Sequence, residues 1–190
     1  MNFKNEIMVS LKLILVGIVI FSVIYPLLLG GIGQIWGDKA QGSLVKYDNN
    51  TVGSSLIGQN FEDPKYFRGR VSSINYDGNY SSSANLAPNN PLLTERLQED
   101  LGNIKDRYQI ENNAVPADIV TESGSGLDPH ISPQAAYMQV SAVASHNNLD
   151  EKVLNNLIEE HTEEKLWGMF GQERVNVLKL NLSLKEVVDK

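Results

Sequence analysis

The residues of this chain with the clearest chemical potential lie together in one segment, TESGSGLDPHISP, at residues 121–133. Ser125, Asp128 and His130 are the residue types of a hydrolytic triad, in which a histidine takes the serine proton and a carboxylate orients the histidine. The glycines that a G-x-S-x-G nucleophile elbow places around its serine are here a serine and a leucine. The members of a triad usually come from distant parts of a chain, so the closeness of these three residues in the sequence is little evidence for one. A membrane-anchored hydrolase is therefore an alternative and not the leading interpretation.

The same segment is typical of a tightly turned loop. Gly124 and Gly126 both permit positive φ, and Ser and Asp side chains in such loops hydrogen-bond to their own backbone. We therefore predict no catalytic residue here, and a structural or interfacial loop instead. Its members are Ser123, Gly124, Ser125, Gly126, Asp128, Pro129 and His130.

Metal-binding patterns are weak in this sequence. The chain has no cysteine, and its three histidines, His130, His146 and His161, are scattered and form no H-E-x-x-H motif. We predict no transition-metal site. His161 falls on the apolar face of a predicted helix, which favours a core or interface role over a ligand role.

Three helices must position this loop, and each has a local start signal. Asn90 can cap the first, with Pro91 at its first position; the second starts at Ser132-Pro133 and the third at Asp150. Their apolar residues recur at helical spacing. These are Leu93, Leu97, Leu101, Ile104 and Tyr108; then Ala136, Val140, Val143 and Ala144; then Val153, Leu154, Leu157, Ile158 and His161.

Strand signals are shorter. Residues 43–60 favour two strands around an Asp48-Asn49-Asn50 turn, whereas residues 61–90 are irregular but rich in aromatics. Residues 174–184, RVNVLKLNLSL, alternate like a strand whose phase slips between Val177 and Leu178. Together the patterns predict an α+β fold, with one N-terminal transmembrane helix followed by a single mixed α/β soluble domain.

The N-terminal region reads as a membrane span. No charged residue occurs from Leu13 to Gly37, a run of 25 residues, which as a helix would exceed the ~30 Å hydrocarbon core. We predict a cytoplasmic tail at 1–12, a transmembrane helix at 13–33 and an extracytoplasmic soluble domain at 34–190. A cleaved signal peptide is the rival interpretation, but the apolar run is long for one and no A-x-A-like site follows it.

Charge indicates the orientation of this span. Lys4, Lys12 and the α-amino group precede it, whereas Lys39 and Lys46 follow it, which favours a cytoplasmic N-terminus by a thin margin. The formal net charge of −7 argues against nucleic acid as the main partner.

The span also offers a surface to another helix. A proline in lipid needs a neighbour to cover the carbonyl that it frees, and glycines allow two helix backbones to approach closely. The candidate transmembrane interface comprises Pro26, Gly30, Gly31 and Gly33. The alternative is that the three glycines only loosen the helix where it leaves the membrane.

Several blocks together closely resemble the C subunit of the Kdp high-affinity potassium-transporting ATPase. The resemblance runs from about residue 10 to residue 184, and its most specific block is the 123–133 segment. The matching blocks are YPLLLGGIGQ (25–34), VGSSLIGQNF (52–61), YFRGR (66–70), SGSGLDPHISP (123–133), HTE (161–163) and RVNVLKLNLSL (174–184).

The resemblance implies a non-catalytic subunit of a P-type ATPase complex for potassium uptake, in the cell membrane. Its partners would be a channel-like potassium-binding subunit, a P-type ATPase subunit and a small single-span subunit. The family role is chaperone-like and raises the ATP affinity of the ATPase subunit. ATP and potassium would belong to the complex, with no cofactor held tightly by this chain.

Topology leaves two molecular roles open. A body outside the cell cannot touch cytoplasmic nucleotide, so it fits better as a cap near the potassium entrance. An anchored solute-binding domain is a further alternative.

Two blocks depart from the family pattern. Val71-Ser72-Ser73 follows Arg70, where the family has Pro and Ser-Ala, and residues 81–87 read SSSANLA in place of a glycine-rich SGGSNLG. A role that needs glycine backbone at 81–87, such as cradling phosphate, is not expected of this chain.

Overall fold

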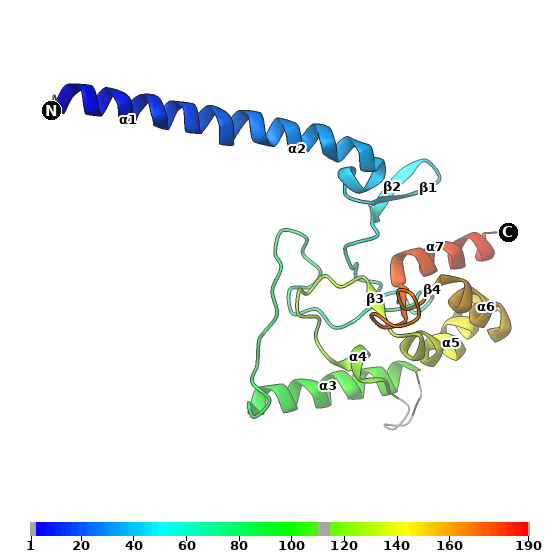
Figure 1. Cartoon of the computed structure of the whole chain (residues 1–190). Coiled ribbons are helices and arrows are strands. Elements are labelled where there is room, and N and C mark those ends of the chain that lie inside the picture. Colours follow the sequence, from blue (N-terminus) through cyan, green and yellow to red (C-terminus); the bar gives the residue numbers. More distant parts are fainter. Residues whose placement is uncertain (1–2, 109, 111–114, 190) are drawn as a thin grey trace. The chain divides into compact units, whose positions relative to one another are not determined.

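A computed structural model of the chain describes residues 3–108, 110 and 115–189 (Figure 1). The chain divides into two compact units, residues 1–44 and residues 45–190. The second unit contains both helices and short strands, so the predicted α+β class with an N-terminal apolar helix is confirmed.

The first unit is one helical run. Among the described residues, Phe3–Gln41 is the helix that is long and apolar enough to cross a membrane, and its large apolar side chains are exposed. It extends beyond both ends of the predicted 13–33 span. Its parts are α1 (Phe3–Ile18), a π-helical segment η1 (Val19–Ile24), α2 (Tyr25–Gly33) and a 3₁₀ segment η2 (Gln34–Gln41).

Pro26 is accommodated by the π-helical segment that precedes it. Proline has no N–H to donate, and its ring collides with the carbonyl four residues earlier. Here the Tyr25 N–H bonds to the Ile20 carbonyl five residues back, which is the wider π spacing. The helix therefore has a π segment before Pro26 and continues into α2.

The second unit opens with the predicted hairpin. Strands β1 (Leu44–Tyr47) and β2 (Asn50–Ser54) pair around Asp48 and Asn49, whose φ values of +48° and +61° suit the favoured two-residue turn. The Tyr47 hydroxyl donates to Asp189 Oδ2 at 2.9 Å, which attaches this hairpin to the last helix.

Side chains cap the starts of the predicted helices as expected. Asn90 Oδ1 accepts the Leu92 N–H, Ser132 Oγ accepts the Ala135 N–H, and Asp150 Oδ1 accepts the Lys152 N–H. Residues 55–90 contain neither helix nor strand. The helices are α3 (Pro91–Tyr108), a short α4 (Ala117–Val120) that the sequence patterns did not predict, α5 (Pro133–Asn147), α6 (Glu151–His161) and α7 (Val177–Val188).

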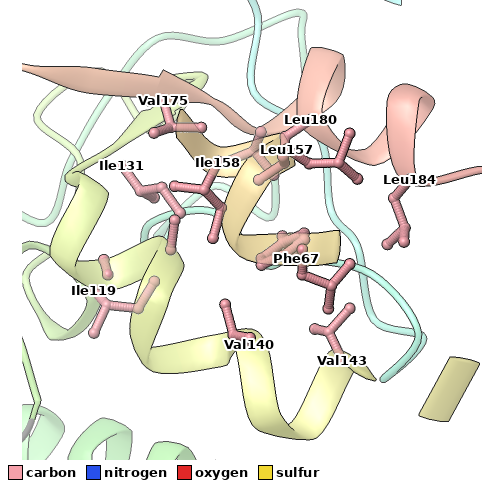
Figure 2. Close-up of a cluster of buried hydrophobic side chains, with 14 of the residues drawn as sticks. Phe67, Ile119, Ile131, Val140, Val143, Leu157, Ile158, Val175, Leu180 and Leu184 are labelled. Carbon is pink, nitrogen blue, oxygen red and sulfur yellow. The ribbon is translucent and has the colours of Figure 1, made fainter. Parts of the chain in front are cut away.

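A small antiparallel sheet collects the segments around the 123–130 loop. Its order is β3 (His130–Ile131), β5 (Arg174–Asn176), β4 (Thr162–Glu163), with His130 opposite Asn176 and Thr162 opposite Val175. The helices α5 and α6 pack together, and α7 packs on α6. Side chains from these helices, from β3 and β5 and from the irregular segment form the core in Figure 2. It includes Phe67, Ile131, Val140, Val143, Leu157, Ile158, Val175, Leu180 and Leu184.

The predicted strand at 174–184 is wrong beyond Asn176. Asn176 Oδ1 accepts the Lys179 N–H and caps α7, so the chain turns helical at Val177. The phase slip noted at residues 177 and 178 marks this change from strand to helix. The inward residues then follow helical spacing: Val177, Leu178, Leu180, Asn181 and Leu184.

Candidate functional site

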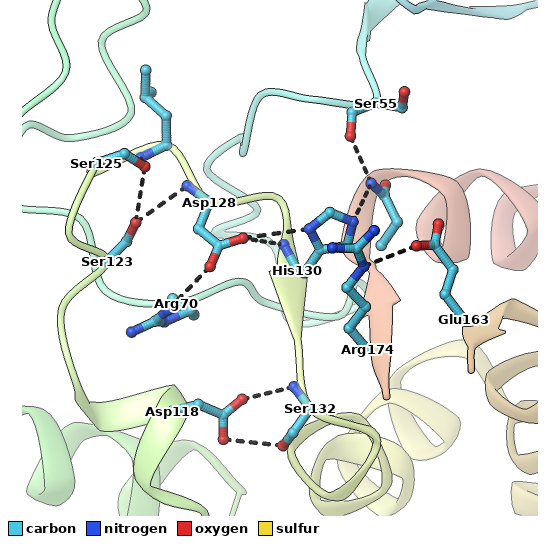
Figure 3. A network of polar contacts seen from close by, with 12 residues as sticks. Ser55, Arg70, Asp118, Ser123, Ser125, Asp128, His130, Ser132, Glu163 and Arg174 are labelled. Atoms are coloured by element: carbon cyan, nitrogen blue, oxygen red, sulfur yellow. Dashed lines mark hydrogen bonds and ion pairs between the residues drawn. The ribbon is translucent and has the colours of Figure 1, made fainter. Parts of the chain in front are cut away.

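The carboxylate of Asp128 joins Arg70 to the loop and to the sheet (Figure 3). Arg70 Nη1 donates to Asp128 Oδ2 at 3.0 Å, and Nη2 donates to the Glu122 carbonyl at 3.1 Å. The other oxygen, Oδ1, accepts the His130 N–H at 3.0 Å and lies 3.4 Å from His130 Nδ1. Asp128 therefore orients both a guanidinium and an imidazole.

The two loop serines bond within the loop. Ser123 is buried, its Oγ accepts the Asp128 N–H at 3.3 Å, and it lies 3.2 Å from Ser125 Oγ. Ser125 Oγ accepts the Leu127 N–H at 3.1 Å. Both hydroxyls thereby hold the backbone of a turned loop, a common use of serine in such segments.

The long irregular segment 55–90 fixes the loop from outside. Because this segment lacks regular structure, its N–H and hydroxyl groups can donate hydrogen bonds to the carbonyls of the loop. The Gly58 N–H donates to Leu127 O at 2.7 Å, Ser72 Oγ to Gly126 O at 2.7 Å, and the Ser82 N–H to Ser125 O at 3.0 Å.

The two loop glycines differ in what they require. Gly126 has φ +71°, and a Cβ there would lie 2.6 Å from Ile74 Cγ1 and 2.8 Å from the Ser82 carbonyl. Gly124 has no positive φ, and a Cβ there would meet nothing within 4 Å. The expectation that both glycines serve a positive φ is therefore right for Gly126 and wrong for Gly124.

Two buried amides hold the strand-like segment that leads to Arg70. Asn181 accepts the Phe67 N–H and donates to the Phe67 carbonyl, both at 2.8 Å. Gln139 does the same for Arg68, at 2.7 and 3.1 Å. These side chains take the place of a neighbouring β-strand and satisfy backbone groups that burial would otherwise leave unpaired.

Sequence patterns missed Arg70, Gln139 and Asn181 as parts of this site. Arg70 was noted only as part of the YFRGR block, because no local sequence pattern indicates that it lies next to Asp128, 58 residues away. Gln139 and Asn181 lie among apolar residues on the buried faces of their helices. A polar residue at such a position indicates a hydrogen-bond partner, because buried amides need one.

The triad residues are near one another but not arranged as a triad. Ser125 Oγ contacts Ser123 and the Leu127 N–H, whereas the His130 ring faces Asp128 with Nδ1 and lies 3.5 Å from Asn176 Nδ2 with Nε2. A serine nucleophile must be within hydrogen-bond reach of its base. The geometry therefore favours a structural role for Ser125.

An open cavity of about 270 Å³ lies beside the network, and its charges are largely paired by the protein. Asp118 accepts the Ser132 N–H at 2.7 Å and its hydroxyl at 3.0 Å. Arg174 Nε donates to Glu163 at 2.9 Å. Within residues 3–108, 110 and 115–189, no three His, Asp or Glu side chains are grouped to hold a metal ion. The arrangement orients the loop and sheet more readily than it binds an ion.

His161 lies on α6 as the periodicity predicted. Its Nδ1 is 2.9 Å from the Leu157 carbonyl, and its Nε2 is 2.9 Å from Ser183 Oγ on α7. His146 Nδ1 is 2.8 Å from the Ala142 carbonyl.

The glycines of the proposed transmembrane interface lie on α2. A Cβ at Gly30 or Gly31 would meet nothing within 4 Å, and one at Gly33 would touch only Ala40 Cβ, at 4.0 Å. Among the described residues of the first unit, nothing packs on Gly30 or Gly31, and the helix–helix interface there stays a prediction.

Acid should weaken the fold through Asp128. Burial raises the pKa of Asp128, but hydrogen bonds from His130 and Arg70 outweigh it and lower the pKa from 3.8 to about 2. The folded carboxyl thus stays ionised at lower pH than the unfolded one, so its stabilisation is present above about pH 4 and is lost between pH 4 and 2. Allowing for solvent screening, we expect a loss of about 1–2 kcal/mol.

Urea unfolding of the full chain in detergent at pH 6 and pH 2.5 measures this loss. The matched variant Asp128→Asn cannot titrate, so it should lose about 1–2 kcal/mol less than the unaltered chain between the two pH values. Equal losses in both proteins would show that Asp128 does not link folding to pH.

Known proteins match this chain over nearly its whole length. The sequence profile of the family described as KdpC, the K⁺-transporting ATPase c chain, matches residues 7–186. A potassium-transporting ATPase KdpC subunit from Caldanaerobacter subterraneus subsp. tengcongensis is 46% identical over 188 residues, 98% of this chain and 97% of the relative. One from Bacillus cereus (strain G9842) is 48% identical over 178 residues, 90% of each. The resemblance seen in the sequence blocks is confirmed, and this chain belongs to the KdpC family, the c chains of K⁺-transporting ATPases.

Proposed function

We propose that the chain is an accessory subunit that assembles and stabilises an ATP-driven, high-affinity potassium uptake pump. The observation that carries the proposal is the match over 97% of a KdpC relative, which includes both the apolar helix and the soluble unit. The internal pairing of Arg70, Asp128 and His130 agrees with a subunit that does no chemistry of its own.

The proposed partners are a channel-like potassium-binding subunit, a P-type ATPase subunit and a small single-span subunit. The apolar helix would contact a partner helix through Pro26, Gly30, Gly31 and Gly33, because small residues allow close backbone approach in lipid. Co-purification of the tagged full chain in mild detergent should recover these subunits, and their absence would contradict the proposal.

The soluble unit is proposed to lie outside the cytoplasm, beyond a single membrane span. This rests on the lysine-bearing N-terminal flank and on the absence of a cleavage motif after the helix. Protease added to cells, with any outer membrane made permeable, should degrade the soluble unit while a cytoplasmic marker stays intact. A fully protected unit, or a mature chain that starts near residue 40, would contradict this topology.

An extracytoplasmic unit can raise ATP affinity only indirectly. It would do so by binding more tightly to the pump conformation that also binds ATP, which is a coupling between two separated sites. The test compares the half-saturating concentrations of ATP and of potassium in two pumps. One carries the full chain, and the other carries the same helix with an unrelated soluble domain. A higher half-saturating ATP concentration in the pump with the unrelated domain supports the chaperone-like role. A higher half-saturating potassium concentration alone supports a cap at the ion entrance.

The hydrolase alternative makes a separate prediction. Because Ser125 Oγ is engaged with Ser123 and Leu127, Ser125→Ala should leave potassium-dependent ATP hydrolysis by the assembled pump within a few-fold. Removal of a true nucleophile costs roughly a thousandfold or more. A loss on that scale would revive a catalytic role, and Ser141→Ala on α5 serves as the control for a serine outside the loop.

A further inference from the structure

A tight hairpin between β4 and β5 exposes four large apolar side chains. In residues 166–170, Leu166 is 62% exposed, Trp167 80%, Met169 74% and Phe170 58%. We call Leu166–Phe170 the apolar hairpin. Contiguous exposed apolar surface on a water-facing unit marks an interaction site more often than scattered single residues do.

The backbone holds this hairpin in one shape. Leu166 and Phe170 exchange hydrogen bonds, with the Leu166 N–H donating to Phe170 O at 2.8 Å and the Phe170 N–H to Leu166 O at 3.0 Å. At its base, Arg174 Nε donates to Glu163 Oε2 at 2.9 Å, next to the paired strands β4 and β5. The side chains at the tip are therefore positioned before any partner arrives.

Trp167 occupies a backbone conformation that its side chain disfavours. Its φ is +53°, a left-handed value that is unusual for a bulky residue and common for glycine. The indole packs edge-on against Phe170, with ring centroids 6.2 Å apart. Trp167 is 80% exposed, so the described fold uses little of its indole, and the strain at this position points to a role in binding.

A bilayer, a second copy of this chain or another subunit of the pump could cover the apolar hairpin, and the first two fit poorly. The charges beside the hairpin sum to −1 over Glu163, Glu164, Lys165, Glu173 and Arg174. They give no electrostatic attraction to an anionic bilayer, and the chain as a whole is also acidic. In a symmetric dimer built on the hairpin, each copy would present the same four side chains to the other. The four side chains expose on the order of 500 Å², and such a contact would cover only part of it, less than the ~800 Å² per partner of a stable interface.

We infer that the apolar hairpin inserts into an apolar hollow on a neighbouring subunit of the pump. A projecting tip with a central tryptophan buries most of its surface only in a concave receptor, and Trp is the residue most enriched at the energetic centres of interfaces. The inference rests on the proposed function and deepens it, because it assigns the contact to these four residues.

The left-handed conformation of Trp167 gives the test its key variant. Trp167→Gly removes the indole at a position where glycine is favoured, so the melting temperature of the full chain should not fall. Recovery of the other pump subunits with the tagged chain should nonetheless fall at least fivefold. The matched control is Leu92→Ser, which removes an apolar side chain that is 60% exposed on α3 and should change recovery less than twofold.

Photo-crosslinking identifies the occupant. A photoreactive amino acid at position 167 of the full chain in the assembled pump should form an adduct with another pump subunit. Adducts with lipid alone, adducts with a second copy, or no adduct in an assembled pump would each overturn the inference. Unchanged recovery with Trp167→Gly would overturn it too. If the unaltered chain recovers no pump subunits, the proposed function itself fails, and the inference falls with it.

Discussion

Gly126→Ala is expected to destabilise the soluble unit by about 2–4 kcal/mol. The left-handed backbone at φ +71° costs a residue with a side chain about 1–2 kcal/mol. The new Cβ would also lie 2.6 Å from Ile74 Cγ1 and 2.8 Å from the Ser82 carbonyl, and overpacking adds roughly 1–3 kcal/mol. Urea unfolding of the full chain in detergent, followed by far-ultraviolet circular dichroism, measures the change.

The control for this variant lies two residues away in the same loop. Gly124→Ala introduces the same methyl group where nothing lies within 4 Å and φ is not positive, so it should change stability by less than about 0.5 kcal/mol. Equal effects at the two positions would mean that the loop does not keep this geometry in solution.

Asn181→Leu is expected to cost about 2–5 kcal/mol. Leucine retains the bulk of the side chain but leaves the Phe67 N–H and carbonyl without their partner in the buried interior. Each buried backbone group left unsatisfied costs about 1–3 kcal/mol. The same urea experiment reports the loss, and disordering of the segment that carries Arg70 should accompany it.

Asn156→Leu is the matched control on α6, where the side chain is exposed. It should change stability by less than about 0.5 kcal/mol, because a surface amide exchanges its hydrogen bonds with water. If both leucine variants lost the same stability, the amide bonds to Phe67 would contribute nothing beyond side-chain volume.

Local signals were enough to predict where three of the helices begin. A cap and the apolar stripe behind it lie within a few residues of each other, so Asn90, Ser132 and Asp150 predicted three helix starts correctly. The hairpin around Asp48 and Asn49 was equally local. The predicted strand after Asn176 failed because V-x-V-L-x-L-x-L fits both an alternating strand and a helix that is buried on a wide face.

The connections within the candidate site could not be predicted in the same way. Arg70 meets Asp128 across 58 residues, Arg68 meets Gln139 across 71, and Phe67 meets Asn181 across 114. No spacing rule reaches over such separations, because the contacts depend on how the layers pack. The 123–130 loop was recognised from its composition, whereas the arginine and the two amides became visible only with the fold.

The position of α7 after the other described helices in the sequence has a consequence for biosynthesis. This helix ends at Val188 and supplies Leu180, Leu184 and the Asn181 amide to a core that otherwise comes mostly from earlier segments. Contacts of such long sequence separation form only once the distant segment is available. The soluble unit therefore cannot complete its interior until α7 has been synthesised. Under the proposed extracytoplasmic topology, the interior of this unit would stay incomplete until α7 had also crossed the membrane.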